Sequence, residues 1–324
     1  MSRQEAINLP EISTDDQYSV PSISGTLFEN VHRLLSSYPI AQRFLAGQLP
    51  RTEWINFLED QRTALVNAGI PAADVDFAKR YPGTIEAFVS HTYQCDTLQG
   101  LLTLPIDWTV SCHDTAQSLQ ASFEHAGSTT YIYPEEGYLL QTLAQAFTAK
   151  RAIFLGSYYG YWAAWAMPAI QAAGGSAVLL DPDERCCDLA RRNLTKLYPD
   201  AAIEVVCSTG QDYLANYDRH QDGSFDLVVL DAELPSDYPD EHLRGKGLYF
   251  ALLESVLPHL ADASLLVCHN ILLQDTTGSD VMRAAVERNR KELTPFLSLV
   301  SDTYQFFTEI QSTEGMGVGL YRKN

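Results

Sequence analysis

The second half of this 324-residue chain alternates short apolar runs with segments of helical periodicity, and this alternation constrains the fold most strongly. Apolar runs that predict strands follow one another at 152–155, 176–181, 202–208, 225–231 and 264–270. Helices are predicted around them at 134–147, from the loop after the first strand to 170, and at 182–198, 213–219 and 245–260. Mostly apolar strands joined by helices are typical of a parallel sheet buried on both faces. The closing residues 303–324 predict a hairpin with Glu314 and Gly315 in its turn, which adds an antiparallel edge.

The first half has a different pattern. Residues 1–24 are polar and contain two prolines, so we expect a flexible N-terminal arm. Apolar side chains then recur at helical spacing, first between 26 and 49 and again between 51 and 71. We therefore predict a helical lid or dimerisation domain over 25–128, followed by a ligand-binding α/β domain over 129–324.

Charge and composition exclude several classes of protein. A formal net charge of −19 argues against nucleic acids and anionic membranes as partners, because both attract basic surfaces. Hydrophobic residues make up 46% and charged residues 19%, as in globular proteins. The sequence contains no apolar stretch of about 18 residues and its N-terminus is polar, so we expect no membrane span, no secretory signal and a cytoplasmic location. The six cysteines lack CxxC or zinc-site spacing, which predicts reduced thiols.

Polar residues stand at the ends of the predicted strands. In open α/β sheets, ligands bind beyond the carboxyl ends of the strands. Gly156 and Gly160 follow the first strand, and Asp181, 25 residues after Gly156, can accept both hydroxyls of a ribose. The segment 208–212 suits the edge of an adenine. The loop has neither the third glycine of a dinucleotide fingerprint nor a Lys-Ser/Thr pair for phosphates, although tight strand–helix packing alone can also explain its two glycines.

Residues 131–323 resemble the class I S-adenosylmethionine-dependent methyltransferases, and within them the catechol and caffeoyl-CoA O-methyltransferase group. The segments that carry the resemblance are "TYIYPEEGYLLQTLAQAFTAKRAIFLGSYYGYW", "VLLDPDERCCDLARRNL", "STGQDYL", "FDLVVLDAE", "LLVCHNILL" and "EGMGVGLYRK". The resemblance implies a Rossmann-like, mostly parallel sheet with a C-terminal antiparallel hairpin, and S-adenosylmethionine as cofactor. The first 125 residues lie outside it.

The resemblance also implies the residues of the site. Those expected to contact the cofactor are Tyr131, Gly156, Ser157, Tyr158, Gly160, Tyr161, Asp181, Pro182, Gly210, Gln211, Asp231 and Ala232. Those expected on the catalytic side are Asp231, His269, Asn270 and Tyr133. Aromatic rings can hold a sulfonium for ~0.5–2 kcal/mol each, so Tyr131, Tyr133, Tyr158 and Tyr161 are candidates for a cage. Packing of a helix on the sheet explains such rings equally well.

Three positions depart from the group's pattern. Phe154 stands where the group has an acidic residue that holds the amino end of the cofactor. Metal-dependent members bind a divalent ion through Asp, Asp and Asn, and the matching residues here are Asp231, His269 and Asn270. Because magnesium prefers oxygen ligands, we predict no metal, with these three as the ligands if one binds. Leu234 replaces the catalytic lysine, so no lysine-assisted deprotonation is expected.

The function predicted from these features is methyl transfer to a small-molecule acceptor, in secondary metabolism, by a possible homodimer. An alternative uses the aminobutyryl arm of the cofactor, either to close azetidine-2-carboxylate with release of methylthioadenosine or in a nicotianamine-type transfer. The loop Phe154–Ser157, which resembles that of nicotianamine-type synthases, supports this alternative. A third possibility is a non-catalytic, cofactor-binding scaffold.

Overall fold

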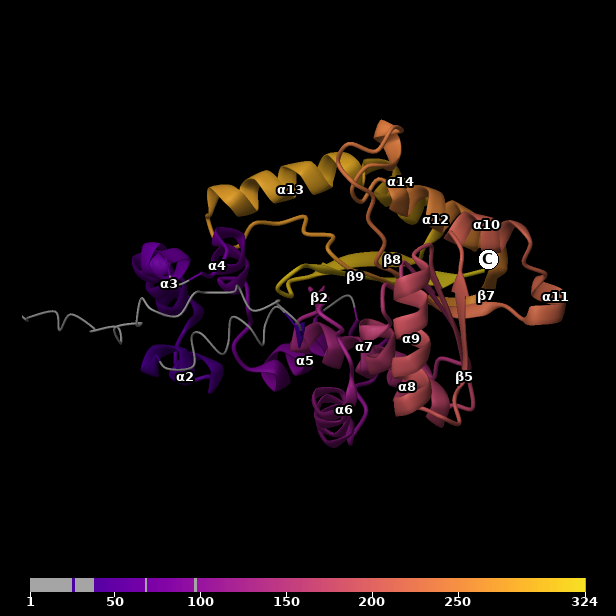
Figure 1. The fold of residues 1–324 in the computed structure, drawn as a ribbon, viewed down its shortest axis with the longest axis horizontal. Helices are drawn as coiled ribbons and strands as arrows, with labels where there is room; N and C mark the ends of the chain where they lie inside the picture. Colours follow the sequence, from indigo (N-terminus) through magenta and orange to yellow (C-terminus); the bar gives the residue numbers. More distant parts are fainter. Residues whose placement is uncertain (1–24, 27–37, 68, 96–97, 324) are drawn as a thin grey trace, which may run out of the picture.

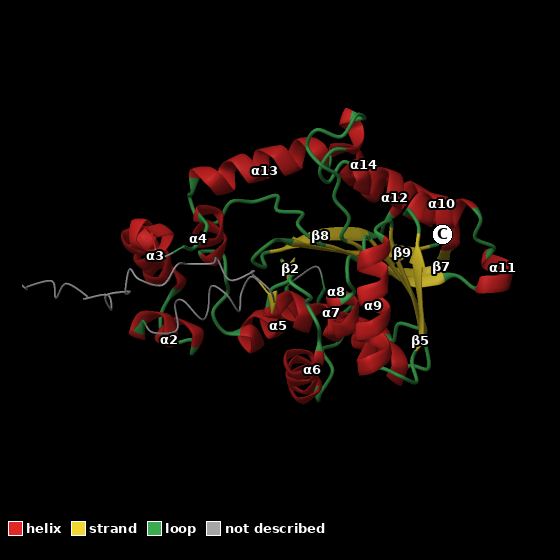
Figure 2. Ribbon diagram, in the orientation of Figure 1, coloured by secondary structure: helices red, strands yellow, loops and turns green. Residues whose placement is uncertain are grey.

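A seven-stranded sheet between two layers of helices forms the centre of the molecule (Figures 1 and 2). The computed structural model describes residues 25–26, 38–67, 69–95 and 98–323. The strands are β3 (Arg151–Leu155), β4 (Ser176–Asp181), β5 (Ala202–Cys207), β6 (Phe225–Leu230), β7 (Leu260–Cys268), β8 (Phe306–Ile310) and β9 (Met316–Arg322). Their spatial order is β5-β4-β3-β6-β7-β9-β8, parallel up to β7 and antiparallel at β9 and β8. The predicted mostly parallel sheet with a terminal hairpin is confirmed.

The two helical layers bury the two faces of this sheet. One face packs against α7 (Pro134–Phe147), α8 (Tyr161–Ala172) and α9 (Glu184–Leu197). The other packs against α10 (Gly210–Ala215), α12 (Leu248–Val256) and α14 (Thr294–Thr303). Every described residue of β6 except Asp226 is buried, as expected for a central strand covered on both sides. The remaining short helices are α11 (Arg219–Asp222) and the 3-10 turns η1 (Glu241–Leu243) and η2 (Leu257–His259).

The N-terminal helices divide between two hydrophobic clusters. They are α2 (Pro39–Leu45), α3 (Arg51–Asn67), α4 (Ala72–Ala78), α5 (Ile85–Gln94) and α6 (Trp108–Ser122). Helices α2 to α4 form a cluster of their own, whereas α5 and α6 pack into the same core as α7, α8 and the sheet. The hydrophobic core therefore continues across residue 128. The division into a lid or dimerisation domain over 25–128 and a ligand-binding domain over 129–324 stays a prediction.

Two parts of the chain differ from the sequence-based expectation. The helix expected from residue 26 is wrong at its start, because β1 (Gly25–Thr26) pairs in parallel with β2 (Thr129–Thr130). The arm expected at 1–24 and the apolar positions of 27–35 lie outside the described residues. No element is predicted from the sequence over 271–303, where the structure has α13 (Asp280–Glu292) and α14. Helix α13 begins beside α4 and runs back to α14 at the sheet (Figure 1).

Candidate active site

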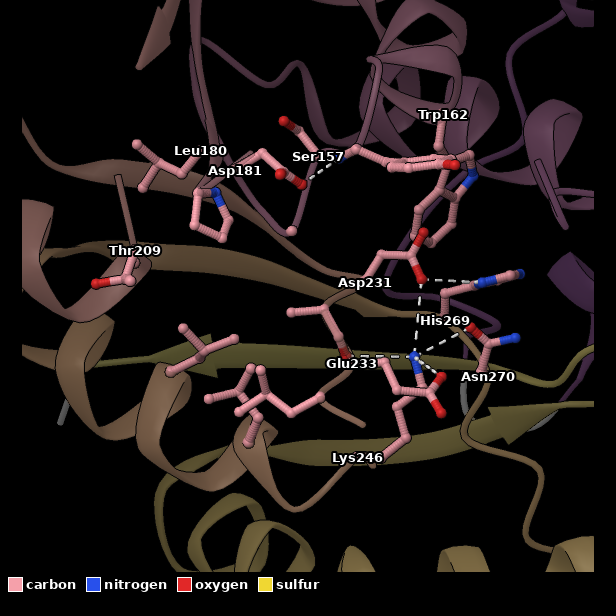
Figure 3. Close-up of a pocket in the computed structure, with 18 of the residues that line it drawn as sticks. Ser157, Trp162, Leu180, Asp181, Thr209, Asp231, Glu233, Lys246, His269 and Asn270 are labelled. Atoms are coloured by element: carbon pink, nitrogen blue, oxygen red, sulfur yellow. Dashed lines mark hydrogen bonds and ion pairs between the residues drawn. The ribbon is translucent and has the colours of Figure 1, made fainter. Parts of the chain in front are cut away.

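A cavity of about 430 Å³ opens at the carboxyl ends of the parallel strands (Figure 3). This volume lies within the ~300–1,000 Å³ typical of small-molecule sites. It is lined by most of the residues predicted from sequence, namely Tyr131, Gly156, Ser157, Tyr158, Tyr161, Asp181, Pro182, Gly210, Gln211, Asp231, Ala232, His269 and Asn270. The sheet brings most of them together because they lie at or just after the carboxyl ends of neighbouring strands, whereas Tyr131 precedes α7 and Tyr161 begins α8.

The loop after β3 forms one wall through its backbone. Gly156 has φ +83°, and a Cβ on it would lie 2.5 Å from the Cα of Ala232, so only glycine fits between the ends of β3 and β6. The amide groups of Gly156 and Ser157 both donate to the carbonyl of Leu180, at 3.1 and 2.9 Å. These contacts fold the loop back over the tip of β4 and leave a concave cradle beside it.

Gly160 does not line this cavity. It has φ +83° and starts α8, and a Cβ on it would meet Ala190 and Leu194 of α9 at 3.3 Å. Its lack of a side chain serves the close packing of the loop on α9, and its contact with the cofactor stays a prediction.

Asp181 lies at the end of β4 with both carboxylate oxygens engaged by backbone amides. Oδ2 accepts from the amide of Tyr158 and Oδ1 from that of Asp183, both at 2.9 Å. Burial raises the pKa of Asp181, and these two donors lower it in turn. Each oxygen keeps a lone pair, so the fixed carboxylate can accept the two hydroxyls of a ribose from the cavity. Gln211 lines the same end, in the first turn of α10, where Thr209 caps the helix.

The aromatic residues separate into rim and wall. Tyr131 and Tyr158 are 57% and 45% exposed and stand at the rim, whereas Tyr161 and Trp162 are buried in the wall. A sulfonium cage built from these rings stays a prediction. Tyr133 is the N-cap of α7, its ring packs into the cluster of α2–α4 and it does not line the cavity, so its catalytic role stays a prediction.

His269 forms a buried ionic bridge at the opposite end of the cavity. Its Nδ1 lies 3.1 Å from Oδ1 of Asp231, and its Nε2 lies 3.0 Å from Oε2 of Glu136. Burial lowers the pKa of His269, but the two carboxylates outweigh it and raise the pKa to about 10. The ring is therefore an imidazolium that donates from both nitrogens, and the ring of Trp162 lies beside it, tilted by 53° with the ring centroids 5.0 Å apart.

Glu136 was not predicted from the sequence, although it anchors this bridge. It is fully buried in the first turn of α7. Besides His269, its carboxylate accepts from the amides of Tyr133 and Glu314 and from the hydroxyl of Ser312, at 2.7–2.9 Å. Four donors thus compensate this buried charge. Its motif, "PEEGYLL", only resembled a family segment and gave no sign that this glutamate faces the strand ends.

A divalent metal does not fit the set Asp231, His269 and Asn270. Both imidazole nitrogens are committed to carboxylates, and Oδ1 of Asn270 accepts from the ammonium of Lys246 at 3.1 Å. Among the residues that the structure describes, no group of three or more His, Cys, Asp or Glu side chains is arranged to hold a metal ion.

Lys246, which was not singled out from the sequence, also lies in this site, while Leu234 still occupies the position where the resembled group has its lysine. Its Nζ lies among the ends of β6 and β7, 3.9 Å from Asp231 and 3.6 Å from Glu233, with its side chain only 4% exposed (Figure 3). It arrives from just before α12, 15 residues after Asp231, so no short motif relates the two positions. The sequence shows only that a lysine without an assigned role follows the strand now labelled β6.

A second, smaller chamber of about 230 Å³ adjoins the cavity and shares Tyr131, Glu233, Lys246 and Asn270 with it. Its outer wall comes from α4 and α13, including Phe77, Ala285 and Asn289. Helix α13 is tied to the site, because Asn289 donates to the carbonyl of Asn270 at 3.0 Å. The N-terminal helices thus contribute directly to one wall of the site.

Comparisons with known proteins find similar methyltransferase domains. Residues 153–271 match the model of a methyltransferase domain family. A catechol O-methyltransferase of Niastella koreensis is 27% identical over 104 residues, which are 32% of this chain and 47% of that relative. The chain therefore spans about half the length of the curated relative that it matches.

Solved structures of methyltransferases are also similar. An O-methyltransferase from Bacillus cereus, solved with SAH, is 18% identical with a TM-score of 0.45, over 74% of this chain and all of that one. A SAH-bound methyltransferase from Podospora anserina is 15% identical with a TM-score of 0.48, over 74% of this chain and 96% of that one. Together with the sheet order, the domain match confirms the predicted S-adenosylmethionine-dependent methyltransferase fold and its cofactor.

No helix in the described part of the chain is both long and apolar enough to cross a bilayer.

Proposed function

We propose that this protein transfers the methyl group of S-adenosylmethionine to a hydroxyl oxygen of a small acceptor. The observation that carries the proposal is a single cavity with Asp181 at one end and the charged residues Asp231 and Lys246 at the other. The adjoining chamber supports an acceptor site, because it opens onto the charged end of the cavity. The match to a catechol O-methyltransferase supports oxygen as the attacked atom.

The residues at the Asp181 end would orient the cofactor. The cofactor itself supplies a methyl group on a sulfonium, which needs no activation by the protein. Gly156 would admit it close to the backbone, and Asp181 would accept the ribose hydroxyls. Tyr161 and Trp162 present ring surface in the wall. Holding two reactants in line can supply ~7–11 kcal/mol of the barrier, so positioning would be the main contribution of the chain.

Calorimetric titration with S-adenosylmethionine, followed by mass analysis of the products with a panel of small phenols and aliphatic alcohols, tests the proposal. We expect micromolar binding, and S-adenosylhomocysteine formed only when an acceptor is added. Failure to bind at millimolar cofactor contradicts the proposal. Binding without turnover across the panel favours a non-catalytic scaffold instead.

A second candidate, cyclisation of the cofactor to azetidine-2-carboxylate, has one observation in its favour. Phe154 is buried in the core against the helices and does not line the cavity, so this strand position offers no carboxylate to hold the cofactor's amine as an ammonium. An amine that is not held in this way can act as an internal nucleophile. Release of methylthioadenosine from enzyme and cofactor alone identifies this reaction or a nicotianamine-type transfer, because methyl transfer yields none.

The cellular setting is part of the proposal. All six cysteines are free, which supports a reducing compartment such as the cytoplasm. A role in secondary metabolism and assembly as a homodimer are also proposed. Light scattering of the purified chain and fractionation of the source cells test the dimer and the location.

A further inference from the structure

The ammonium of Lys246 sits within a shell of oxygen atoms at the end of the cavity. Five oxygens approach Nζ, from Asn270 Oδ1 at 3.1 Å, Ala232 O and Tyr249 Oη at 3.3 Å, Glu233 Oε2 at 3.6 Å and Asp231 Oδ1 at 3.9 Å. We call these five groups the oxygen shell. They come from the ends of β6 and β7 and from α12, and the close-up shows three of them converging on Nζ (Figure 3).

The contacts in the oxygen shell are long for a buried cation. Charge-assisted N–H···O bonds are ~2.7–2.9 Å, whereas the shortest distance here is 3.1 Å. The charge of a buried ammonium must be compensated by nearby polar or charged groups, and here five oxygens at long distances do so together. Because none of them holds Nζ tightly, the ammonium can turn its protons to one further oxygen from the cavity or the adjoining chamber, both of which it lines.

We propose that Lys246 is a built-in cation that takes the place a divalent metal would need and binds the reacting oxygen of the acceptor. This inference rests on the proposed methyl transfer. The oxygen shell contains two carboxylates, an amide oxygen and a carbonyl, which are the donors that Mg²⁺ and Mn²⁺ prefer. In this chain these oxygens surround the ammonium group of the Lys246 side chain, where a metal ion would otherwise bind. His269 also contributes a fixed positive charge rather than a ligand atom.

The acceptor class follows from the neighbourhood of Nζ. The adjoining chamber is lined by the apolar side chains of Phe77, Leu272 and Ala285 and by the charged side chains of Arg288, Glu292 and Glu314. It therefore fits a small hydroxyl compound that carries further polar groups, with its reacting oxygen at Lys246. In the reaction a carbon–oxygen bond forms while the carbon–sulfur bond breaks, and its electron pair stays on sulfur. The hydroxyl proton leaves to Glu233, whose carboxylate is 59% exposed and can pass it to water.

Manganese binding tests the oxygen shell without any need for turnover. We would titrate Mn²⁺ into the full chain and measure free Mn²⁺ by electron paramagnetic resonance. The wild type should bind none below millimolar concentration, because Nζ occupies the shell. Lys246→Ala should bind one Mn²⁺ at least about tenfold more tightly, and Lys246→Ala combined with Glu233→Gln should lose that gain. Lys246→Met, which fills the space without charge, is the matched control and should gain no site.

Two results of this titration overturn the inference. One is sub-millimolar Mn²⁺ binding by the wild type at this site, which needs no variant to be folded. The other is a folded Lys246→Ala, with native circular dichroism and cofactor affinity, that gains no Mn²⁺ site.

Turnover tests the acceptor role separately. If an acceptor is methylated, EDTA should leave the wild-type rate unchanged. Lys246→Met should lower kcat about 100-fold, the effect of losing one oxyanion donor, while changing cofactor affinity less than about threefold. An unchanged kcat in Lys246→Met, or inhibition by EDTA that Mg²⁺ reverses, overturns this role. If no compound of the panel is methylated, the proposed function fails, and the Mn²⁺ titration still decides whether Lys246 replaces a metal.

Discussion

The two ends of the cavity are built in different ways. The end at Asp181 is made of backbone groups and one carboxylate, and its key contacts join residues at the tips of neighbouring strands. The end at Asp231 is made of charged side chains from α7, β6, β7 and the approach to α12, whose hydrogen bonds span up to 133 positions. The first end is therefore fixed by local chain geometry and the second by a long-range ionic network.

This difference predicts that substitutions at the two ends of the cavity affect different properties of the protein. A defect at the backbone end should change ligand affinity with a limited loss of stability, because the loop lies at the surface of a complete core. A defect in the ionic end should lower stability first, because it leaves a buried charge without its partner.

The largest effect is expected for Glu136→Ala. This change leaves the buried imidazolium of His269 without one of its two carboxylates, and breaking a buried ion pair costs ~3–5 kcal/mol. Urea unfolding should show a loss of this size. Glu124→Ala, which removes a surface partner of Lys196, is the control and should cost less than ~1 kcal/mol. Equal losses in the two variants would mean that the His269 bridge adds nothing to stability.

The contrast also explains what the sequence could predict. Asp181, Gly156 and Asp231 each directly follow an apolar strand, so the alternation of strands and helices was enough to bring them to one edge of the sheet. Glu136 and Lys246 lie in a helix turn and a loop, where no periodicity tells which way a charged side chain points. The packing of Tyr133 could not be predicted for the same reason, because the α2–α4 cluster that receives its ring is far away in sequence. Helix α13 was not predicted, although its buried residues Met282, Val286 and Asn289 recur at helical spacing.

The backbone end should respond most to Gly156→Ala. A left-handed φ costs a non-glycine residue ~1–3 kcal/mol, and the added Cβ would also collide with the backbone of Ala232. We expect S-adenosylmethionine affinity to fall at least about tenfold by calorimetry. Gly223→Ala is matched, since Gly223 also has positive φ but faces open space. Gly223→Ala should lower stability and keep the wild-type affinity for S-adenosylmethionine. If both variants lose affinity equally, backbone strain alone explains the loss, and Gly156 has no specific role in cofactor binding.

Asp181→Asn should have a smaller effect. The amide keeps one oxygen that can accept, but it loses the charge and one of the two acceptors that fix the Tyr158 and Asp183 amides. A hydrogen bond to a charged group contributes ~1.5–3 kcal/mol, so we expect about a tenfold weaker cofactor affinity with little change in unfolding free energy. Affinity equal to that of the wild type would remove Asp181 from the cofactor site.

The smallest effect is expected for Asp74, a carboxylate of the N-terminal helix α4. Burial raises the pKa of Asp74 from 3.8 to about 6, and its charge contributes to raising the pKa of Tyr131 at the cavity rim. The folded state therefore holds the proton more tightly than the unfolded state, so stability falls as pH rises between these two values. Because the group is half-buried, the loss should stay below ~1 kcal/mol. Asp74→Asn should reduce the fall of stability between pH 4 and pH 6, relative to the wild type, in urea unfolding at each pH. If Asp74→Asn keeps the wild-type dependence of unfolding free energy on pH, other carboxyl groups account for that dependence. Asp74 would then not belong to the charged network around Asp231.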